Sequence, residues 1–152
     1  MRTVLCYLEK DGSYLMLCRN KKKNDLNANK WVGVGGKLEP GETPDAALLR
    51  EVKEETGLAL SFYTYRGLIH FFADGFSEDM YLYTAPLPDG ELADCDEGTL
   101  ALIPKEDVLS LPLWEGDRYF LEPLIKGDCE PFVLSLRYRG DVLISAVFEE
   151  KR

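Results

Sequence analysis

The stretch GKLEPGETPDAALLREVKEETGL, residues 36–58, is the most informative part of the chain because it holds the start and stop signals of one helix. Thr43 suits the N-cap, and Pro44 suits the first helical position, where a missing N–H leaves nothing unpaired. Gly57 offers the left-handed conformation in which many helices end. Between them lie helix-forming and apolar residues, so the sequence predicts a helix over residues 45–56.

Three acidic residues share one face of this predicted helix. Glu51, Glu54 and Glu55 stand at i, i+3 and i+4, where like charges repel one another. Clustered carboxylates are ligands for hard cations such as Mg²⁺, Mn²⁺ or Ca²⁺, and the smaller ions bridge to substrate phosphates. The alternative is a solvated acidic face that is paired with Arg50 and Lys53. From this face alone both interpretations stay open.

The same segment resembles the Nudix box, G-x5-E-x7-R-E-U-x-E-E-x-G-U, in which U is a bulky aliphatic residue. Every defined position matches. The matching residues are Gly36, Glu42, Arg50, Glu51, Val52, Glu54, Glu55, Gly57 and Leu58. The resemblance implies an α/β fold, the Nudix α/β/α sandwich with a mixed central sheet, and we expect residues 1–152 to form a single Nudix domain.

The resemblance also implies a metal site and a mechanism. Glu51, Glu54, Glu55 and the Gly36 carbonyl are expected to hold Mg²⁺, with Mn²⁺ possible, on the phosphates of a nucleotide. Glu97 matches a position where MutT-like relatives carry a further carboxylate that binds metal or acts as a base; otherwise it is an ordinary loop acid. The expected catalytic residues are Glu54, Glu51, Glu97 and Arg50. Arg50 would orient the glutamates, braced by Glu42.

Two flanking motifs make the chain similar to MutT-like enzymes that hydrolyse oxidised purine nucleoside triphosphates. They are Lys30-Trp31 and Trp114-Glu115-Gly116-Asp117. In such relatives a tryptophan at the position of Trp114 stacks on the base, and an acidic residue at the position of Asp117 binds its edge. The chain departs from the mammalian pattern at Val32 and Gly116, where those relatives often carry polar groups.

Trp114 and Asp117 each also have a purely structural interpretation. Trp114 is otherwise a packing aromatic, and Asp117 a first-turn helix residue that the helix dipole favours. Arg19, Trp31 and Lys37 complete the expected substrate-binding set. The two bases would contact phosphate oxygens, or else they are solvated surface charges.

The predicted function is Mg²⁺-dependent cleavage of a nucleoside triphosphate to a nucleoside monophosphate and pyrophosphate, with an 8-oxo-dGTP diphosphatase as the leading case. One alternative keeps the metal and changes the substrate to a nucleotide sugar, a dinucleotide polyphosphate or a capped RNA end. Another is a Nudix domain that senses a nucleotide without turning it over.

Composition narrows the partners. The chain has 152 residues, of which 45% are hydrophobic, enough for one domain with a core. A net charge of −9 argues against binding a nucleic-acid polymer or an anionic membrane, so a small nucleotide is the expected partner. We expect a cytoplasmic monomer or homodimer without membrane segments. The four cysteines are spaced too widely for a zinc site or a disulfide framework and are expected to be reduced.

Turn residues and alternating apolar residues predict the remaining elements. Strands are expected over residues 3–9, 14–19, 60–72, 79–85, 99–103, 132–138 and 142–148, with an extended glycine-rich stretch at 31–38. The segments 21–30 and 86–97 are expected as loops, 106–109 as a helical turn and 114–126 as a second helix. His70, on an apolar strand, is expected to be packed or hydrogen-bonded rather than catalytic.

Overall fold

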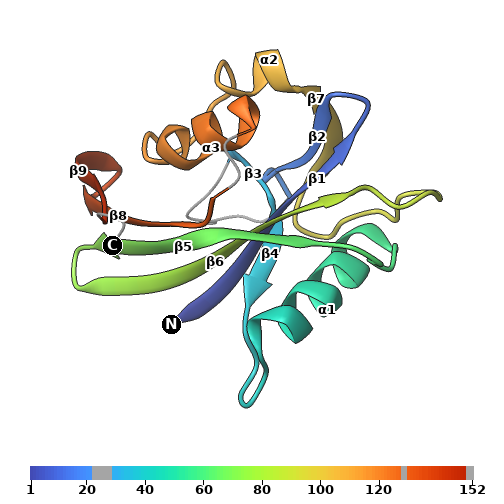
Figure 1. The fold of residues 1–152 in the computed structure, drawn as a ribbon, viewed down its shortest axis with the longest axis horizontal. Helices are drawn as coiled ribbons and strands as arrows, with labels where there is room; N and C mark the ends of the chain where they lie inside the picture. The colour runs from blue at the N-terminus through green and yellow to red at the C-terminus, as the bar shows by residue number, and fades with distance from the viewer. Residues whose placement is uncertain (22–28, 128–129, 150–152) are drawn as a thin grey trace.

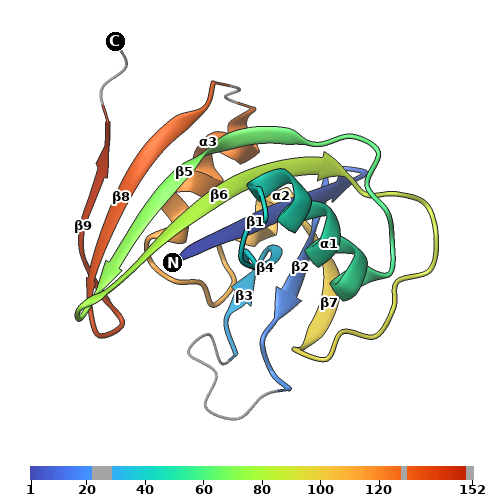
Figure 2. The ribbon, with the colours of Figure 1, turned by 90° about the horizontal axis from the view of Figure 1, so that it is seen from below.

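A mixed β-sheet runs through the middle of the protein, with α1 against one face and α2 and α3 against the other (Figures 1 and 2). The computed structural model describes residues 1–21, 29–127 and 130–149. The elements are β1 (Arg2–Lys10), β2 (Ser13–Cys18), β3 (Trp31–Val32), β4 (Val34–Lys37), α1 (Pro44–Thr56), β5 (Thr64–Ala73), β6 (Phe76–Pro86), β7 (Thr99–Pro104), α2 (Lys105–Val108), α3 (Asp117–Lys126), β8 (Phe132–Arg139) and β9 (Val142–Phe148).

The strand order is β3-β2-β1-β6-β5-β8-β9, with β4 paired to β1 and β7 paired to β2. The β1–β6 and β5–β8 pairs are parallel, and the other pairs are antiparallel. β1 therefore pairs with β2, β4 and β6, which places it at the centre of the sheet. The predicted mixed sheet and its α/β/α layers are present.

Side-chain alternation along β1 builds a core on each face of the sheet. Val4, Cys6 and Leu8 are buried against α1, in a cluster that includes Leu48 of that helix. Tyr7 points the other way and is buried in the second cluster, which contains Phe120 and two leucines of α3. Both faces of β1 are therefore covered by a helix.

Helix α1 begins and ends as its sequence predicts. The Thr43 hydroxyl accepts a hydrogen bond from the Ala46 amide, Pro44 occupies the first turn, and Gly57 adopts φ 78° at the C-terminus. The N–H of Gly57 closes the helix on Lys53 O. These local caps fix where the helix stops, and so fix which residues of its face meet β4.

Several predicted boundaries were wrong. The second helix starts at Asp117 rather than at residue 114, because the Asp117 amide closes a turn onto Trp114 O before the helix begins. The strand predicted from residue 60 starts at Thr64, where pairing with β6 begins. The β5–β6 turn is shorter than expected, and the glycine-rich stretch forms two strands, β3 and β4.

Other predictions hold within the described residues. The N-terminal and C-terminal hairpins are both formed, and Cys6, Cys18 and Cys95 are free thiols. His70 Nδ1 lies 2.7 Å from Asp79 Oδ1, the pairing role expected of it. Cys129 and most of the predicted 21–30 loop lie outside the described residues. No described helix has the length and apolar character needed to cross a bilayer.

Candidate active site between β4, α1 and α3

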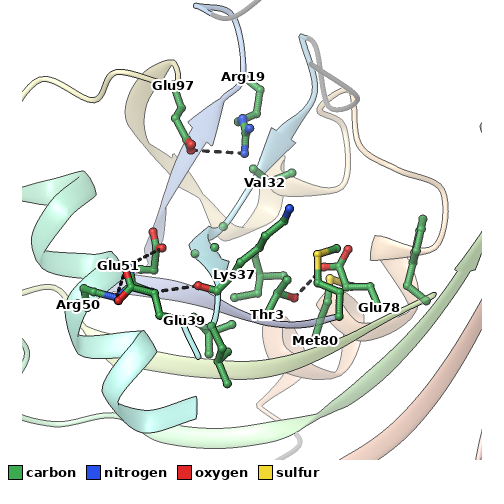
Figure 3. A pocket seen from close by; sticks show the side chains of 18 of the residues that line it. Thr3, Arg19, Val32, Lys37, Glu39, Arg50, Glu51, Glu78, Met80 and Glu97 are labelled. Atoms are coloured by element: carbon green, nitrogen blue, oxygen red, sulfur yellow. Dashed lines mark hydrogen bonds and ion pairs between the residues drawn. The ribbon is translucent and has the colours of Figure 1, made fainter. Parts of the chain in front are cut away.

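A cleft of about 950 Å³ opens between α1, which carries the predicted metal ligands, and the start of α3, where base binding is predicted. That volume falls within the usual range for small-molecule sites. Residues of α1 and β4, such as Glu51 and Lys37, line one end (Figure 3). Trp114 and Asp117, which lie on the α3 side of the sheet, line the other. Of the residues predicted for the site, the lining contains Arg19, Gly36, Lys37, Arg50, Glu51, Glu97, Trp114 and Asp117. Glu54, Glu55 and Trp31 lie outside the lining.

Arg50 connects the loop before α1 to the acidic face of the helix. Its Nε and Nη2 donate to the two carboxylate oxygens of Glu42 at 2.8 and 2.9 Å, a bidentate pair. Its Nη1 donates to Glu51 at 2.9 Å and to Glu54 at 3.3 Å, and Nη2 also donates to Lys37 O at 3.0 Å. This geometry supports the expected role of Arg50, which is to orient the glutamates of α1 while Glu42 holds its guanidinium in place.

Glu51 lies directly against the β4 backbone. A Cβ on Gly36 would meet Glu51 Oε1 at 2.5 Å and Cδ at 2.6 Å, so a larger residue would push the carboxylate away. Gly36 itself is held by pairing with Val4 of the central strand. Burial raises the pKa of Glu51, and the Arg50 guanidinium opposes that shift. The absent side chain at residue 36 therefore sets where this carboxylate sits.

Glu55 lies deeper, on the side of α1 that faces the sheet. It is buried and accepts a hydrogen bond from the Gly35 amide at 2.9 Å. Burial, a hydrogen bond with Glu97 and the charges of Glu97 and Glu51 raise its pKa to about 9. Burial and the neighbouring carboxylates thus favour the protonated form of Glu55, which reduces the repulsion in the carboxylate group.

The four carboxylates have the chemistry of a divalent-cation site, but they are not drawn together as a finished ligand set. The Glu54 side chain is 58% exposed and turns to Arg50. Among the described residues, no three histidine, cysteine, aspartate or glutamate side chains converge closely enough to enclose an ion. The residues nevertheless suit a hard cation, because they supply oxygen donors and negative charge. The missing side chain at Gly36 also lets the Glu51 carboxylate lie against the β4 backbone, next to the Gly36 carbonyl group.

Two bases reach the same end of the cleft. Arg19 Nη1 lies 3.5 Å from Glu97 Oε2, so the arginine links the carboxylates to the end of β2. The Lys37 side chain extends from β4 into the open cleft (Figure 3). Both cations therefore face the space in which an anionic substrate group would lie next to the acidic residues.

The opposite end of the cleft is aromatic and apolar. The Trp114 ring packs edge-on against Phe71 and Tyr138, and Lys30 Nζ lies 4.9 Å from its centre. Trp114 is only 8% exposed. It is at once a packed aromatic and part of the cleft wall, so the two interpretations of this residue do not exclude each other.

Asp117, at the first position of α3, is buried beside this aromatic wall. Burial raises the pKa of its carboxyl to about 8, and the charge of Lys30 opposes the shift. The missing polar group at residue 116 also has a structural reason. The Gly116 amide donates to Tyr138 Oη at 2.6 Å, and a Cβ on Gly116 would meet that oxygen at 2.5 Å.

The structure places Trp31 away from the cleft. Its side chain packs on the hydrophobic cluster shared with α3, while its neighbour Val32 lines the cleft. Successive residues of a strand point to opposite faces, so only one of the two can face the cleft. Trp31 is therefore not among the residues that line the cleft, and its contact with substrate stays a prediction.

Sequence reasoning missed several residues of the cleft. Thr3 and Met80 are paired across β1 and β6 and both line it, and the Thr3 hydroxyl donates to Glu78 Oε2 at 2.7 Å (Figure 3). Burial raises the pKa of Glu78. The two strands pair in parallel from distant parts of the chain, so no local pattern indicated that they meet.

Comparison with known proteins gives the family. The NUDIX domain profile matches residues 1–124. The chain belongs to the Nudix family. An oxidized purine nucleoside triphosphate hydrolase of Danio rerio is 40% identical to this Nudix chain over 132 residues, which cover 85% of it and 83% of the relative. The Bacillus subtilis (strain 168) Nudix hydrolase YvcI is 30% identical over 132 residues, which cover 83% of this chain and 80% of the relative.

Solved structures agree on the fold. The crystal structure of a MutT protein from Bacillus halodurans superposes with a TM-score of 0.86, covering 99% of each chain at 24% identity. The predicted Nudix resemblance, the α/β fold and the class of hydrolase acting on phosphoric anhydride bonds are thereby confirmed. Nudix hydrolases generally use divalent metal ions, which agrees with the oxygen donors on α1.

Proposed function

We propose that this Nudix hydrolase cleaves a nucleoside triphosphate to a nucleoside monophosphate and pyrophosphate, and that its substrate is an oxidised purine nucleotide such as 8-oxo-dGTP. One water molecule adds across the anhydride bond, and a proton is released. Such an enzyme would remove damaged nucleotides from the precursor pool. The relative from Danio rerio, named for this activity, supports the substrate class.

The observation that carries the proposal is the polarity of the cleft. Carboxylates, Arg19 and Lys37 gather at the end formed by α1 and β4, while Trp114 and Asp117 stand at the other end. A nucleoside triphosphate has the same division between a charged phosphate chain and a flat base. The cleft therefore suits one orientation of such a substrate, with the phosphates beside α1.

The proposed metal is Mg²⁺, with Mn²⁺ accepted, held by Glu51, Glu54, Glu55, Glu97 and the Gly36 carbonyl. When bound, such an ion neutralises phosphate oxygens and makes a coordinated water more acidic. Arg50 keeps Glu51 and Glu54 on one face of α1 through its two hydrogen bonds to them. Arg19 and Lys37 would bind phosphate oxygens.

Glu55 and Glu97 form a pair of which only one member faces the cleft. They interact through a hydrogen bond, and burial together with this neighbour raises the pKa of Glu55. We propose Glu97 as the member that faces the attacking water, because it lines the cleft while Glu55 is buried behind it.

The proposal treats residues 1–152 as one Nudix domain. Its support is that β8 and β9, which lie beyond the matched residues 1–124, continue the same sheet through the β5–β8 pair. Base recognition is assigned to Trp114, which would stack on the base, and to Asp117, which would bind its edge.

Chromatographic separation of the products formed in Mg²⁺ tests the proposal, with dGTP, 8-oxo-dGTP, nucleotide sugars and dinucleotide polyphosphates as parallel substrates. Only the nucleoside triphosphates should give pyrophosphate, because the other two classes are hydrolysed to pairs of phosphate monoesters or nucleoside phosphates. The expected result is turnover of nucleoside triphosphates with preference for the oxidised purine, lost in Glu51→Gln and Glu54→Gln. Glu106→Gln, on α2 outside the cleft lining, is the matched control. Turnover of another class only would reject the substrate, and nucleotide binding without any turnover would indicate a sensing domain.

A further inference from the structure

Glu78 places a carboxyl on the floor of the cleft, at a point where the proposed function assigns no residue. The side chain is half-buried and lines the cleft. Its Oε2 accepts a hydrogen bond from the Thr3 hydroxyl at 2.7 Å (Figure 3). Its Oε1 has no hydrogen-bond partner within residues 1–21, 29–127 and 130–149. One oxygen of the carboxyl is therefore held in place, and the other is available as an acceptor.

Strand pairing holds this carboxyl, so its place does not depend on a loop. Side chains alternate along β6, which puts Phe76, Glu78 and Met80 on one face, and all three line the cleft. Thr3 reaches the carboxyl from the neighbouring strand β1 and is only 7% exposed. The apolar neighbours on either side of Glu78 limit the access of water, which strengthens a hydrogen bond made there.

The order of the strands places Glu78 between the two ends of the cleft. Lys37 on β4 is opposite Thr3 on β1, and β1 pairs along its other edge with β6. Glu78 on β6 is opposite Phe71 on β5, whose ring centre lies 6.2 Å from that of Trp114. Neighbouring strands lie about 4.8 Å apart, so β6 is about 10 Å from β4 and one strand from the aromatic end. In a nucleotide the sugar lies between the phosphates and the base, and Glu78 faces the corresponding part of the cleft.

Of the three parts of a nucleotide, the sugar is the one that suits this carboxyl. A carboxylate repels phosphate oxygens, so the phosphate chain is disfavoured beside Glu78. The base already has partners in the proposed function, Trp114 and Asp117. A sugar hydroxyl donates to a carboxylate and also accepts from a protonated carboxyl, so it can pair with Glu78 even though burial raises the pKa of this residue.

We propose that Glu78 Oε1 accepts a hydrogen bond from the 3′-hydroxyl of the substrate sugar, while Thr3 fixes the carboxyl for this contact. The inference rests on the proposed function and deepens it, because it names the group that recognises the sugar. The 3′-hydroxyl is assigned because it is the one free sugar hydroxyl that a deoxynucleoside triphosphate carries.

Two substrates that differ by one hydroxyl test the contact. In the wild type, kcat/KM should be about tenfold higher for 8-oxo-dGTP than for its 2′,3′-dideoxy counterpart, because the analogue leaves the Glu78 acceptor unpaired. Glu78→Met keeps a long side chain without its two oxygens, and this variant should hydrolyse both substrates with equal kcat/KM. Thr3→Val should lower the preference to about threefold, because the carboxyl is no longer fixed.

Asp79→Asn is the matched control. Asp79 is the next residue of β6, its side chain points to the opposite face of the sheet, and it pairs with His70 outside the cleft lining. This variant loses a carboxylate from the same strand and should keep the tenfold preference. Thermal melts of all variants confirm that each one is folded.

A binding measurement makes the same comparison without turnover. In calorimetric titrations with Mg²⁺, the wild type should bind 8-oxo-dGMP about tenfold more tightly than the 2′,3′-dideoxy analogue, and Glu78→Met should bind both equally. If the wild type hydrolyses no nucleoside triphosphate, the proposed function fails, whereas this difference in binding still decides whether Glu78 recognises the sugar.

Three results would overturn the inference. The first is equal kcat/KM and equal affinity for the deoxy and dideoxy compounds in the wild type, a comparison that requires no variant. The second is a tenfold preference that persists in Glu78→Met. The third is a change in the preference for 8-oxo-dGTP over 8-oxo-dATP in Glu78→Met while the hydroxyl preference stays the same, which would place Glu78 beside the base.

Discussion

Gly36→Ala tests whether the position of the Glu51 carboxylate controls activity. The new Cβ would lie 2.5 Å from Glu51 Oε1, whereas ordinary contact begins at 3.4 Å, so the carboxylate must retreat by about 0.9 Å. The carboxylate is the free end of a flexible side chain, so it can move without disturbing β4. A displacement of this size at a catalytic group reduces the rate by about 10²-fold. Stability should change little, with Tm within about 4 °C of the wild type.

The assay is pyrophosphate release in saturating Mg²⁺, together with a thermal melt of each variant. Gly35→Ala is the matched comparison, because its Cβ would meet Val4 O at 1.9 Å, a backbone atom of the central strand that cannot retreat. We expect Gly35→Ala to lose folding and Gly36→Ala to lose only turnover. Wild-type turnover in Gly36→Ala would refute the reasoning, as would a loss of folding equal to that of Gly35→Ala.

Three further predictions use the same protein. The Arg50 guanidinium and the Glu39 amide lower the pKa of Glu42 to about 2 from 4.5, so its contribution to stability is complete above about pH 4.5 and is lost as the pH falls toward 2. Thermal melts over this range should show a steeper loss for the wild type than for Glu42→Gln, and parallel curves would contradict the role given to the pair. EDTA should abolish turnover, and Mg²⁺ should raise the Tm of the wild type but not of Glu51→Gln; an equal rise in both would remove Glu51 from the metal site. Trp114→Leu should raise KM for the nucleoside triphosphate by about tenfold at similar kcat, because stacking on a base is lost, and an unchanged KM in steady-state kinetics would return Trp114 to a packing role alone.

The elements with local signals were the ones that the sequence could predict. Thr43, Pro44 and Gly57 act within one turn of α1, and the structure has the helix between them. The start of β5 depends instead on where β6 begins to pair with it, at the Thr64–Thr84 partners, and no residue near Thr64 carries that information. Boundaries set by distant strands were therefore predicted less well than those set by caps.

The candidate site divides in the same way. The contacts among Glu42, Arg50 and Glu51 follow from spacing along a loop and a helix, and the predicted arrangement is present. Trp31 and Val32 are adjacent in sequence, and only the packing of β3 decides which of them faces the cleft. Thr3 and Glu78 were missed because they meet only through the register of β1 against β6.

The central place of β1 also has a consequence for folding and biosynthesis. This strand is synthesised before its parallel partner β6, which ends at Pro86, so both of its edges can be paired only after β6 has been made. Contacts between segments so far apart in sequence slow folding. Until β6 pairs with it, β1 exposes apolar side chains on both of its faces. Substitutions in β1 should therefore reduce the yield of folded protein in cells more than equally buried substitutions in β8, even where the final stability is the same.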